Sequence, residues 1–470
     1  MIQEKTIDCK AFEEELYAMV CGVGREMYKS ALEAWDAQLH ESRDKPVYRD
    51  KGTRTTVLKT IMGEVEYNRH VYTFTDESGR RGTVYLLDKA IGKTSSGFFS
   101  EALLERVGAA VCELPYRKAA AEISSLTGQS ISHAAAWNVT QRLGWRVDEI
   151  EIENAAKARA NKGAGTIETK LLFEEQDGIW LHLQGKDRKK YGASHEMKLA
   201  IAYDGAKKTG KNRYTLTNKV SCANFESVDK FCRRKEGVIA ANFNVDEIVL
   251  RALNGDGASW IKRSIDADTV YQLDTFHRNR AICRAAPDEG ARKTMIKLLY
   301  AKQIDELLIY IDALANSVED EDREKALREL YTYFFNNKDG LILYKRRGFD
   351  LPPPPEGKEY LNMGAMESNV FSIIGNRMKG RRRNWSIAGG NNLARLLCLK
   401  ATGKLRDALS VMTSHMPERY AEEIFTALSA TKIAKSVGKG YNGTHQAYCP
   451  AIPEYKWLRS FGSLPSLVEI

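Results

Sequence analysis

Several features that this sequence lacks restrict the class of protein to which it can belong. The eight cysteines form no CxxC pair, and the nearest two, Cys222 and Cys232, are ten residues apart. This scatter favours a reducing cytoplasm, reduced thiols and no zinc site. No apolar run approaches the roughly 18 residues of a membrane-spanning helix, and residues 1–5 lack the apolar core of a signal peptide. We therefore expect a cytoplasmic protein.

A nucleotide-binding loop is also missing. Gly92-Lys93-Thr94 resembles the end of a phosphate loop, but Leu87 stands where the motif requires its first glycine. The GxG at Gly22 and Gly24 lies inside a helical pattern with no strand before it. Neither stretch therefore indicates a site for a nucleotide.

The overall composition is that of an ordinary globular protein with more than one domain. The 470 residues are 43% hydrophobic and 28% charged, and a chain of this length is expected to form about two to four domains. The formal net charge is +9 and the isoelectric point about 8.9. A positive excess of this size favours a polyanionic partner only weakly.

Residues 1–95 are expected to form an N-terminal helix followed by a β-hairpin region. Apolar side chains recur at helical spacing over residues 11–40, after which the period changes to two. The alternating stretches are residues 56–61, 65–72 and 84–87.

Residues 96–160 predict a helical, helix-turn-helix DNA-binding domain and a linker. A helix at 116–123, a glycine-containing turn at 127–130 and a second helix at 131–142 have the spacing of that motif. Its second helix would begin at a serine N-cap and present groups able to reach base edges or phosphates. These groups are Ser132, His133, Asn138, Gln141 and Arg142. The alternative is a plain helical hairpin whose polar side faces water. Residues 145–165 are expected to form a helical linker with a solvated, charged face.

Residues 165–287 predict an α/β core. Strand-like stretches occupy residues 171–184, 197–203, 213–220, 248–253 and 269–273, with a helical stretch at 225–239. Three strands in a meander, then helix, strand, helix, strand and helix, is the order of the ribonuclease-H-like fold. The first and fourth strands are adjacent in that fold, so Asp177 and Asp256 would be neighbours.

Acidic side chains follow the fourth and fifth of these strands. Asp256 lies between Gly255 and Gly257, where the backbone can turn sharply. Asp274 follows the next strand, with His277 three residues later. Because functional sites in open α/β sheets are built at the carboxyl ends of the strands, we expect a site at this edge.

The remaining residues predict a helical insertion and the completion of the core. Residues 288–357 are helical and charged and end in four consecutive prolines, which act as a stiff boundary. Residues 358–410 complete the core, with Glu367 opening a helix. A basic stretch follows, containing Lys379, Arg381, Arg382 and Arg383. Residues 411–470 form a C-terminal tail for which the sequence indicates no role.

Asp177, Asp256 and Glu367 suggest a site for two Mg²⁺ (or Mn²⁺) ions. Hard cations prefer oxygen ligands, and two ions about 3.5–4 Å apart can stabilise both the attacking and the leaving oxygen of a displacement at phosphorus. Clustered carboxylates without metal would raise one another's pKa. Each residue also has a plainer interpretation, because most of the 62 acidic residues are surface groups and Asp-Gly is a common turn dipeptide.

Together these motifs resemble the ISLre-two type of bacterial insertion-sequence DDE transposases, a UPF0236-like group allied to the Mutator-like transposases. The most specific part is the sequence GDGASWIK at residues 255–262, with a D-x-x-H signature at Asp274 and His277. The Asp-Gly at residue 177 and the Glu-x-x-Val at residue 367 are weaker matches. The resemblance covers most of the chain, from the hairpin near residue 54 to Ser386.

The resemblance implies that Asp177, Asp256 and Glu367 are the catalytic acids, and that Asp274 and His277 order the site or position the DNA. Glu174 or Glu175 stays open as the first acid, because Gln176 stands where a small residue is expected. A purely structural role for His277 also stays open.

The expected function is therefore a transposase that cuts DNA at the ends of its own element and joins them to target DNA. Its partners would be terminal inverted repeats and target DNA, bound by a homodimer or higher oligomer in the nucleoid. The helix-turn-helix would read the repeats, and the basic stretch would contact phosphates. Two alternatives remain: a nuclease of the same fold without strand transfer, and a DNA-binding regulator without catalysis.

Overall fold

A computed structural model describes residues 8–76, 79–93, 99–211, 213–380 and 383–410. Within these ranges the chain divides into two compact units, residues 8–104 with 124–130, and residues 105–123 with 131–410. Each unit has a hydrophobic core of its own. The fold is mixed α/β, and among the described residues no helix is long and apolar enough to cross a bilayer.

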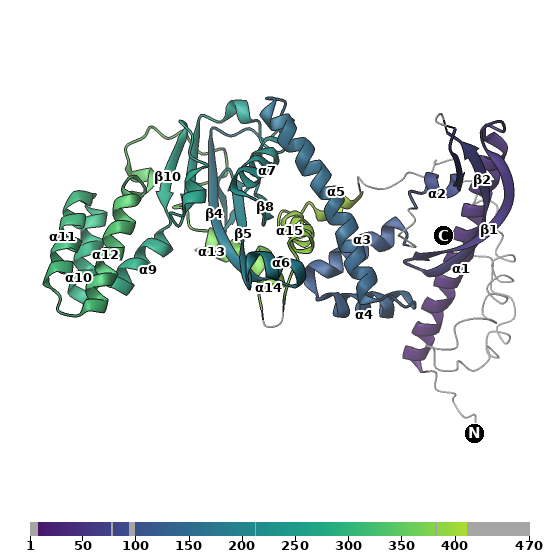
Figure 1. The fold of residues 1–470 in the computed structure, drawn as a ribbon, viewed down its shortest axis with the longest axis horizontal. Coiled ribbons are helices and arrows are strands. Elements are labelled where there is room, and N and C mark those ends of the chain that lie inside the picture. Colours follow the sequence, from purple (N-terminus) through teal and green to yellow (C-terminus); the bar gives the residue numbers. More distant parts are fainter. Residues whose placement is uncertain (1–7, 77–78, 94–98, 212, 381–382, 411–470) are drawn as a thin grey trace, which may run out of the picture. The chain divides into compact units, whose positions relative to one another are not determined.

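The first unit packs a long helix, α1 (Cys9–Ser42), against a three-stranded antiparallel sheet (Figure 1). The strands are β1 (Arg49–Thr60), β2 (Gly63–Thr75) and β3 (Arg81–Val84). Leu32 and Trp35 of α1 share a core with Leu58 and Tyr67 of the hairpin. The predicted helix and hairpin are confirmed.

The strand predicted at residues 84–87 is wrong in its second half. β3 ends at Val84, and α2 (Leu86–Ala90) follows at once. Leu87 is buried in the same core as the hairpin. Residues 84–87 were predicted as a strand because a short apolar run has the same pattern in a buried helix and in a buried strand.

Three helices connect the sequence of the first unit to the main sheet: α3 (Glu101–Glu113), α4 (Tyr116–Thr127) and α5 (His133–Arg159). Ser132 caps α5, accepting a hydrogen bond from the Ala135 amide at 3.1 Å. The helix runs unbroken through the residues predicted to be a solvated linker. Glu151 within it is paired with Arg234 and Arg395, at 3.6 and 3.4 Å, so this part of α5 is docked on the core.

The main sheet has the strand order β10-β9-β4-β5-β8. Its strands are β4 (Leu171–His182), β5 (Ser194–Tyr203), β8 (Val220–Asn224), β9 (Leu250–Gly255) and β10 (Thr269–Leu273). β4, β9 and β10 run parallel, whereas β5 is antiparallel to both of its neighbours. The prediction that the first and fourth strands of this region are adjacent is confirmed.

The third strand was predicted too early in the chain. Residues 213–216 form β7, which pairs with β6 (Ala206–Gly210) in a separate two-stranded ladder. Asn218 has a φ of 51°, so the chain turns there and cannot continue as a strand. Its side chain donates to Asp204 Oδ2 at 2.7 Å, and the sheet strand begins only at Val220.

Helices surround the main sheet. α7 (Val228–Ala240) and α15 (Ile387–Ala401) pack on β8. This unit also contains α6 (Gly185–Tyr191), α8 (Ser259–Lys262), α9 (Thr275–Ala285), α13 (Met366–Asn369), α14 (Asn376–Met378) and α16 (Leu405–Ser410). A π-helical stretch, Val370–Gly375, joins α13 to α14.

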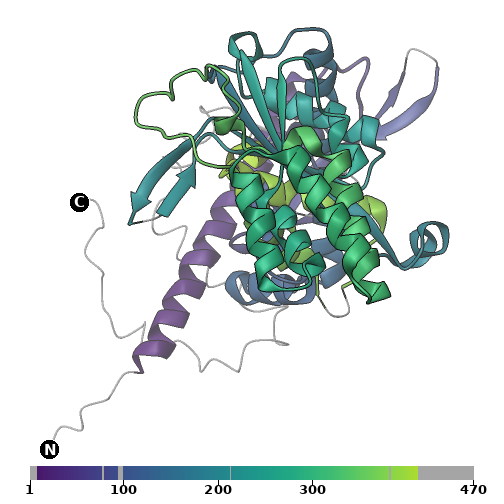
Figure 2. The ribbon, with the colours of Figure 1, turned by 90° about the vertical axis from the view of Figure 1, so that its left-hand side faces the viewer.

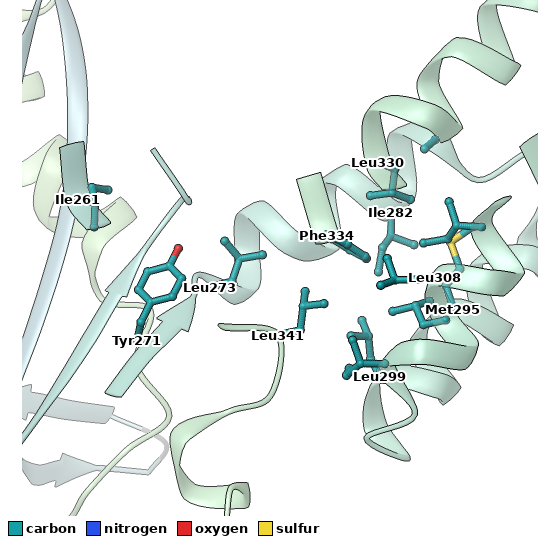
Figure 3. Close-up of a cluster of buried hydrophobic side chains, with 14 of the residues drawn as sticks. Ile261, Tyr271, Leu273, Ile282, Met295, Leu299, Leu308, Leu330, Phe334 and Leu341 are labelled. Carbon is teal, nitrogen blue, oxygen red and sulfur yellow. The ribbon is translucent and has the colours of Figure 1, made fainter. Parts of the chain in front are cut away.

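The predicted helical insertion contains α10 (Glu289–Tyr300), α11 (Ile304–Ser317) and α12 (Glu321–Asn336), seen in the foreground of Figure 2. Its core includes Met295, Leu308 and Phe334 and continues through Leu273 to Tyr271 of β10 (Figure 3). The insertion therefore shares one hydrophobic core with the sheet.

Replacing Phe334 by Ala should destabilise this unit by about 3–5 kcal/mol, because the fully buried ring leaves a cavity between α12 and its neighbours. The measurement is the midpoint of chemical unfolding. Phe335→Ala is a matched control, since that ring is 58% exposed and should cost less than about 1 kcal/mol. Equal effects of the two substitutions would contradict the burial assigned to Phe334.

Candidate functional site

The backbone brings Asp177 and Asp256 to the same edge of the sheet. Gln176 of β4 and Gly255 of β9 form the last pair between these parallel strands, and one acid follows each of them. β4 itself continues, with Asp177 opposite Leu199 of β5. Asp177 thus lies on a strand supported from one side only, where side chains of other segments can approach it.

A tight turn fixes the loop that carries Asp256. Gly257 has a φ of +93°, and a Cβ added there would lie 2.8 Å from the Asn337 side chain. The Asp256 carboxylate accepts a hydrogen bond from the Ala258 amide at 2.9 Å, and its carbonyl accepts one from the Tyr333 hydroxyl at 2.7 Å. The helical insertion therefore braces this loop from α12.

Glu367 reaches the same edge from the start of α13. Ligand atoms of Asp177, His277 and Glu367 all lie within 4.8 Å of one another. These residues come from β4, α9 and α13, which are far apart in the sequence. Asp256 is not a member of this tight group, although the sequence predicted it as a ligand and gave His277 a supporting role.

The charge of Asp256 nevertheless acts on the group. The pKa of Asp177 is raised to about 6, mainly by burial and also by the negative charges of Asp256 and Glu367. His277 and the Gly178 amide, which donates to Asp177 Oδ1 at 2.7 Å, act in the opposite direction. Asp177 therefore lies within electrostatic reach of both of the other predicted acids. An uncompensated carboxylate whose pKa is raised in this way is what a bound cation would relieve.

His277 is oriented by Asp274, the N-cap of α9. Asp274 Oδ1 accepts from the Phe276 and His277 amides at 2.9 and 3.1 Å, and it lies 3.2 Å from His277 Nδ1. This hydrogen bond raises the pKa of His277, and the charges of Asp177, Asp274 and Asp256 act in the same direction. With Nδ1 occupied by a carboxylate, Nε2 is the ring nitrogen left for a ligand, an arrangement common around metal sites.

Glu175 connects two segments of this edge, a structural role that the sequence did not reveal. Its buried carboxylate accepts hydrogen bonds from three successive amides, those of Gly364, Ala365 and Met366, at 2.9, 3.2 and 3.2 Å. Burial raises the pKa of this carboxyl. These amides directly precede Glu367, so Glu175 attaches the start of α13 to β4.

Glu174 lies on the opposite face of β4, because successive side chains of a strand alternate. It pairs with Lys235 and, at 3.1 Å, with Arg251. Of the two alternatives for the first acid, Glu174 is therefore in a structural ion pair, and Glu175 supports the edge from beneath.

Asn254 links Glu175 to the aspartate that orients His277. Its Nδ2 donates to Glu175 Oε2 at 3.0 Å and to Asp274 Oδ2 at 2.8 Å, and its Oδ1 accepts from Gln272 Nε2 at 3.3 Å. We call Glu175, Asn254 and Asp274 the support network. A pattern in the sequence could have indicated this network: a polar residue stands two positions before an acid, as Glu175 does before Asp177 and Asn254 before Asp256. Residues two apart in a strand point to the same face of the sheet.

The residues predicted to contact DNA have varied positions. His133 and Asn138 are exposed on α5, Ser132 is the N-cap, and Arg142 is partly buried. The prediction that Gln141 contacts DNA is wrong, because its side chain is buried and accepts a hydrogen bond from Asn392 of α15 at 2.7 Å. It faces the core and is withdrawn from the DNA-contact set.

The basic stretch is only partly described. Lys379 is exposed. Arg383 Nη1 donates to the carbonyls of Asn376 and Arg377 at 2.7 and 2.9 Å, so it stabilises the end of α14. Arg381 and Arg382 lie outside the described residues.

Comparison with known proteins places the chain in a family. The model of an uncharacterised protein family, UPF0236, matches residues 2–414. The chain belongs to this family. A UPF0236 protein in the vanSb 3′ region of Streptococcus gallolyticus is 22% identical over 449 residues, which are 94% of this chain and 92% of that protein. A UPF0236 protein of Caldanaerobacter subterraneus subsp. tengcongensis, whose name joins eleven designations, is 23% identical over 390 residues, 81% of this chain and 75% of that protein.

Among solved structures, a Drosophila P element transposase strand transfer complex is similar over 73% of this UPF0236 chain and 92% of that chain. The sequence identity is 10% and the TM-score 0.22. A likeness of this size does not establish a shared fold.

Without metal, replacing Asp177 by Asn should stabilise the UPF0236 protein at pH 8, by on the order of 1–2 kcal/mol after allowance for solvent screening. The folded-state pKa, about 6, lies above the ordinary 3.8. The folded state therefore disfavours the ionised group, and the advantage of Asn should shrink as the pH falls from 6 to 4. Thermal unfolding in EDTA at several pH values measures this. A constant difference across that range would contradict the raised pKa.

Proposed function

We propose that this UPF0236 protein is a metal-dependent DDE transposase with a ribonuclease-H-like catalytic domain. The observation that carries the proposal is the meeting of Asp177, Glu367 and His277 at the carboxyl ends of two parallel strands, with Asp256 within electrostatic reach. The strand order β10-β9-β4-β5-β8, in which only β5 opposes its neighbours, supports the proposed fold.

The donor set fits a divalent cation that prefers oxygen. Asp177, Glu367 and Asp256 would hold Mg²⁺ or Mn²⁺, and two carboxylates with one imidazole are compatible with Mn²⁺ in particular. When bound, such ions supply activation of the attacking oxygen and neutralisation of the leaving oxygen. The raised pKa of Asp177 implies that metal and protons compete for this residue below about pH 6.

The protein's own groups would orient the reacting DNA. The hydrogen bond to Asp274 would keep a proton on His277 Nδ1 and leave Nε2 to contact a phosphate oxygen. The support network fixes the spacing of the segments that carry Asp177, Asp256 and Glu367. Such preorganisation is required when catalysis depends on positioning and electrostatics rather than on a covalent nucleophile.

Two displacements at phosphorus would follow one another. Water attacks a phosphodiester at the element end, the P–O3′ bond breaks, and a 3′-hydroxyl and a 5′-phosphate result. That 3′-hydroxyl then attacks target DNA, forming one phosphodiester as another breaks. The exposed residues of α5 would read the terminal repeats, while Lys379, Arg381 and Arg382 would contact phosphates, and a homodimer or higher oligomer would hold both ends.

The multiple designations of one relative agree with a mobile gene. The name of the Caldanaerobacter protein joins eleven of them, as expected if one element had been copied to several places in a genome.

Asp177→Asn, Asp256→Asn and Glu367→Gln should each reduce DNA cleavage by at least about 10³-fold, because each removes a charge that a metal requires. The substrate is a supercoiled plasmid carrying the DNA that flanks the gene on both sides, incubated with Mg²⁺ or Mn²⁺. DNA affinity should change less than about threefold. The matched control is Asp266→Asn, an exposed aspartate in the loop after α8, which should retain full activity.

The products decide between the remaining alternatives. Ends joined to target DNA support the transposase, whereas cleavage without joining would indicate a nuclease of the same architecture. Metal-independent binding without cleavage under either ion would leave only a DNA-binding regulator.

Glu175→Gln should raise the metal concentration needed for half-maximal cleavage by about 10–100-fold, because α13 loses its anionic anchor while Asp177 is unchanged. Glu174→Gln is the matched comparison on the opposite face of β4. It should lower the melting temperature by breaking a buried ion pair, with little effect on the metal requirement. A similar metal requirement in the two variants would show that Glu175 has only a structural role.

A further inference from the structure

A second cluster of metal-ligand side chains lies in the first unit, outside the proposed catalytic site. Ligand atoms of His40, Asp50 and His70 all lie within 4.8 Å of one another. These residues belong to three elements, the last turn of α1, β1 and β2. The sequence analysis excluded a zinc site on the distribution of cysteines, an argument that does not apply to histidine and aspartate ligands.

The local structure explains how the cluster is assembled. Asp36 and His40 are four residues apart and therefore share a face of α1. His70 and Tyr72 share a face of β2, and Asp50 pairs with Tyr72 in the β1–β2 register. A bulge between Asp50 and Thr53 shifts this register just beside His70. Such bulges re-aim side chains and are frequent beside functional sites.

Both imidazoles are oriented by protein groups. His70 Nδ1 lies 2.6 Å from Asp36 Oδ2, and His40 Nδ1 lies 3.2 Å from the Tyr72 hydroxyl. Asp36 is 3% exposed and also accepts from the His70 amide at 2.9 Å. A buried carboxylate on the far nitrogen of a histidine is the usual outer partner of a metal-binding imidazole, because it fixes the tautomer and leaves Nε2 as the ligand.

We propose that His40, His70 and Asp50 bind a transition-metal ion of the Zn²⁺ type. Two imidazoles and one carboxylate suit Zn²⁺ better than Mg²⁺, which requires oxygen ligands. The rings are stacked, with centroids 4.0 Å apart and planes at 28°. A tetrahedral ion with bonds of about 2 Å would draw the three ligand atoms closer and leave one position for water. The Asp50 side chain is exposed and its Oδ1 accepts a hydrogen bond from the Gly52 amide at 3.0 Å, so Oδ2 is the oxygen left to bind the ion.

The ion would fasten the end of α1 to the hairpin. At this junction the His40 ring lies beside the rings of His70 and Tyr72, and Leu39 packs against the core of the unit, so an ion would add bonds to contacts that already exist. Metal binding would therefore contribute stability to the first unit, independently of the proposed catalytic function.

The test is titration of the full-length chain with Co²⁺, whose visible absorption distinguishes tetrahedral from octahedral ligation, and with Zn²⁺ followed by thermal unfolding. A His277→Ala background removes the imidazole of the other cluster. We expect one equivalent of Co²⁺ with the absorption of a tetrahedral centre, and a higher melting temperature with Zn²⁺. Failure of the His277→Ala chain to bind one equivalent overturns the proposal.

Variants locate the ion. His40→Ala and His70→Ala should each remove the Co²⁺ signal, while Asp36→Asn should weaken binding about 10–100-fold without abolishing it. His182→Ala is the matched control, an exposed histidine on β4 that should bind Co²⁺ normally. Circular dichroism measures whether each variant folds. If an alanine variant does not fold, His70→Gln is used instead, because it also removes an imidazole ligand. Equal binding by the His70 and His182 variants would contradict the site.

Discussion

The proposed active site depends on one buried interaction, the carboxylate of Glu175 accepting three successive amides at the start of α13. A buried carboxylate is costly unless donors surround it, and Glu175 has five, including the Tyr203 hydroxyl and the Asn254 amide. The same bonds determine where Glu367 lies relative to Asp177. If α13 moved away, the buried charge of Glu175 would lose hydrogen-bond donors. The free-energy cost of that loss holds α13 in place and so keeps the site ordered.

Electrostatics points in the same direction as this geometry. The Glu175 carboxylate of the support network accepts several hydrogen bonds, whereas Asp177 and Asp256 above it accept hydrogen bonds from main-chain amides of their own turns, those of Gly178 and Ala258. The pKa of Asp177 is raised mainly by burial and that of His277 mainly by its hydrogen bond to Asp274, and the neighbouring carboxylates raise both pKa values further. The fully buried carboxylate of Glu175 thus lies beneath the edge, and the partly buried Asp177 and the exposed Glu367 lie above it. The π-helical stretch after Glu367 adds to this picture, since such irregular turns are frequent at functional sites.

The sequence predicted the parts of this arrangement that depend on local pattern. The apolar runs of β4, β9 and β10, and the Asp-Gly turns, indicated an edge with acids, and the strand register confirms that Asp177 and Asp256 follow paired residues. The identity of the tight group was not predictable, because the choice of His277 over Asp256 depends on how α9 leaves the sheet. Asn218 in a left-handed conformation displaced the third strand, and the ion pairs of Glu151 with Arg234 and Arg395 hold an expected linker against the core as a helix.

The helical insertion is best understood as part of the site. If the insertion were an independent domain, it would have a separate hydrophobic core. Instead, the packing of Phe334 and Met295 continues into Leu273 and Tyr271 of the sheet. Polar contacts follow the same route: the Tyr333 hydroxyl binds the Asp256 carbonyl, and Lys262 donates to the Asn336 carbonyl at 2.7 Å. Gly257 must lack a side chain because Asn337 occupies the space. The residues inserted between Asp256 and Glu367 therefore fix the first of these acids, just as Glu175 fixes the second.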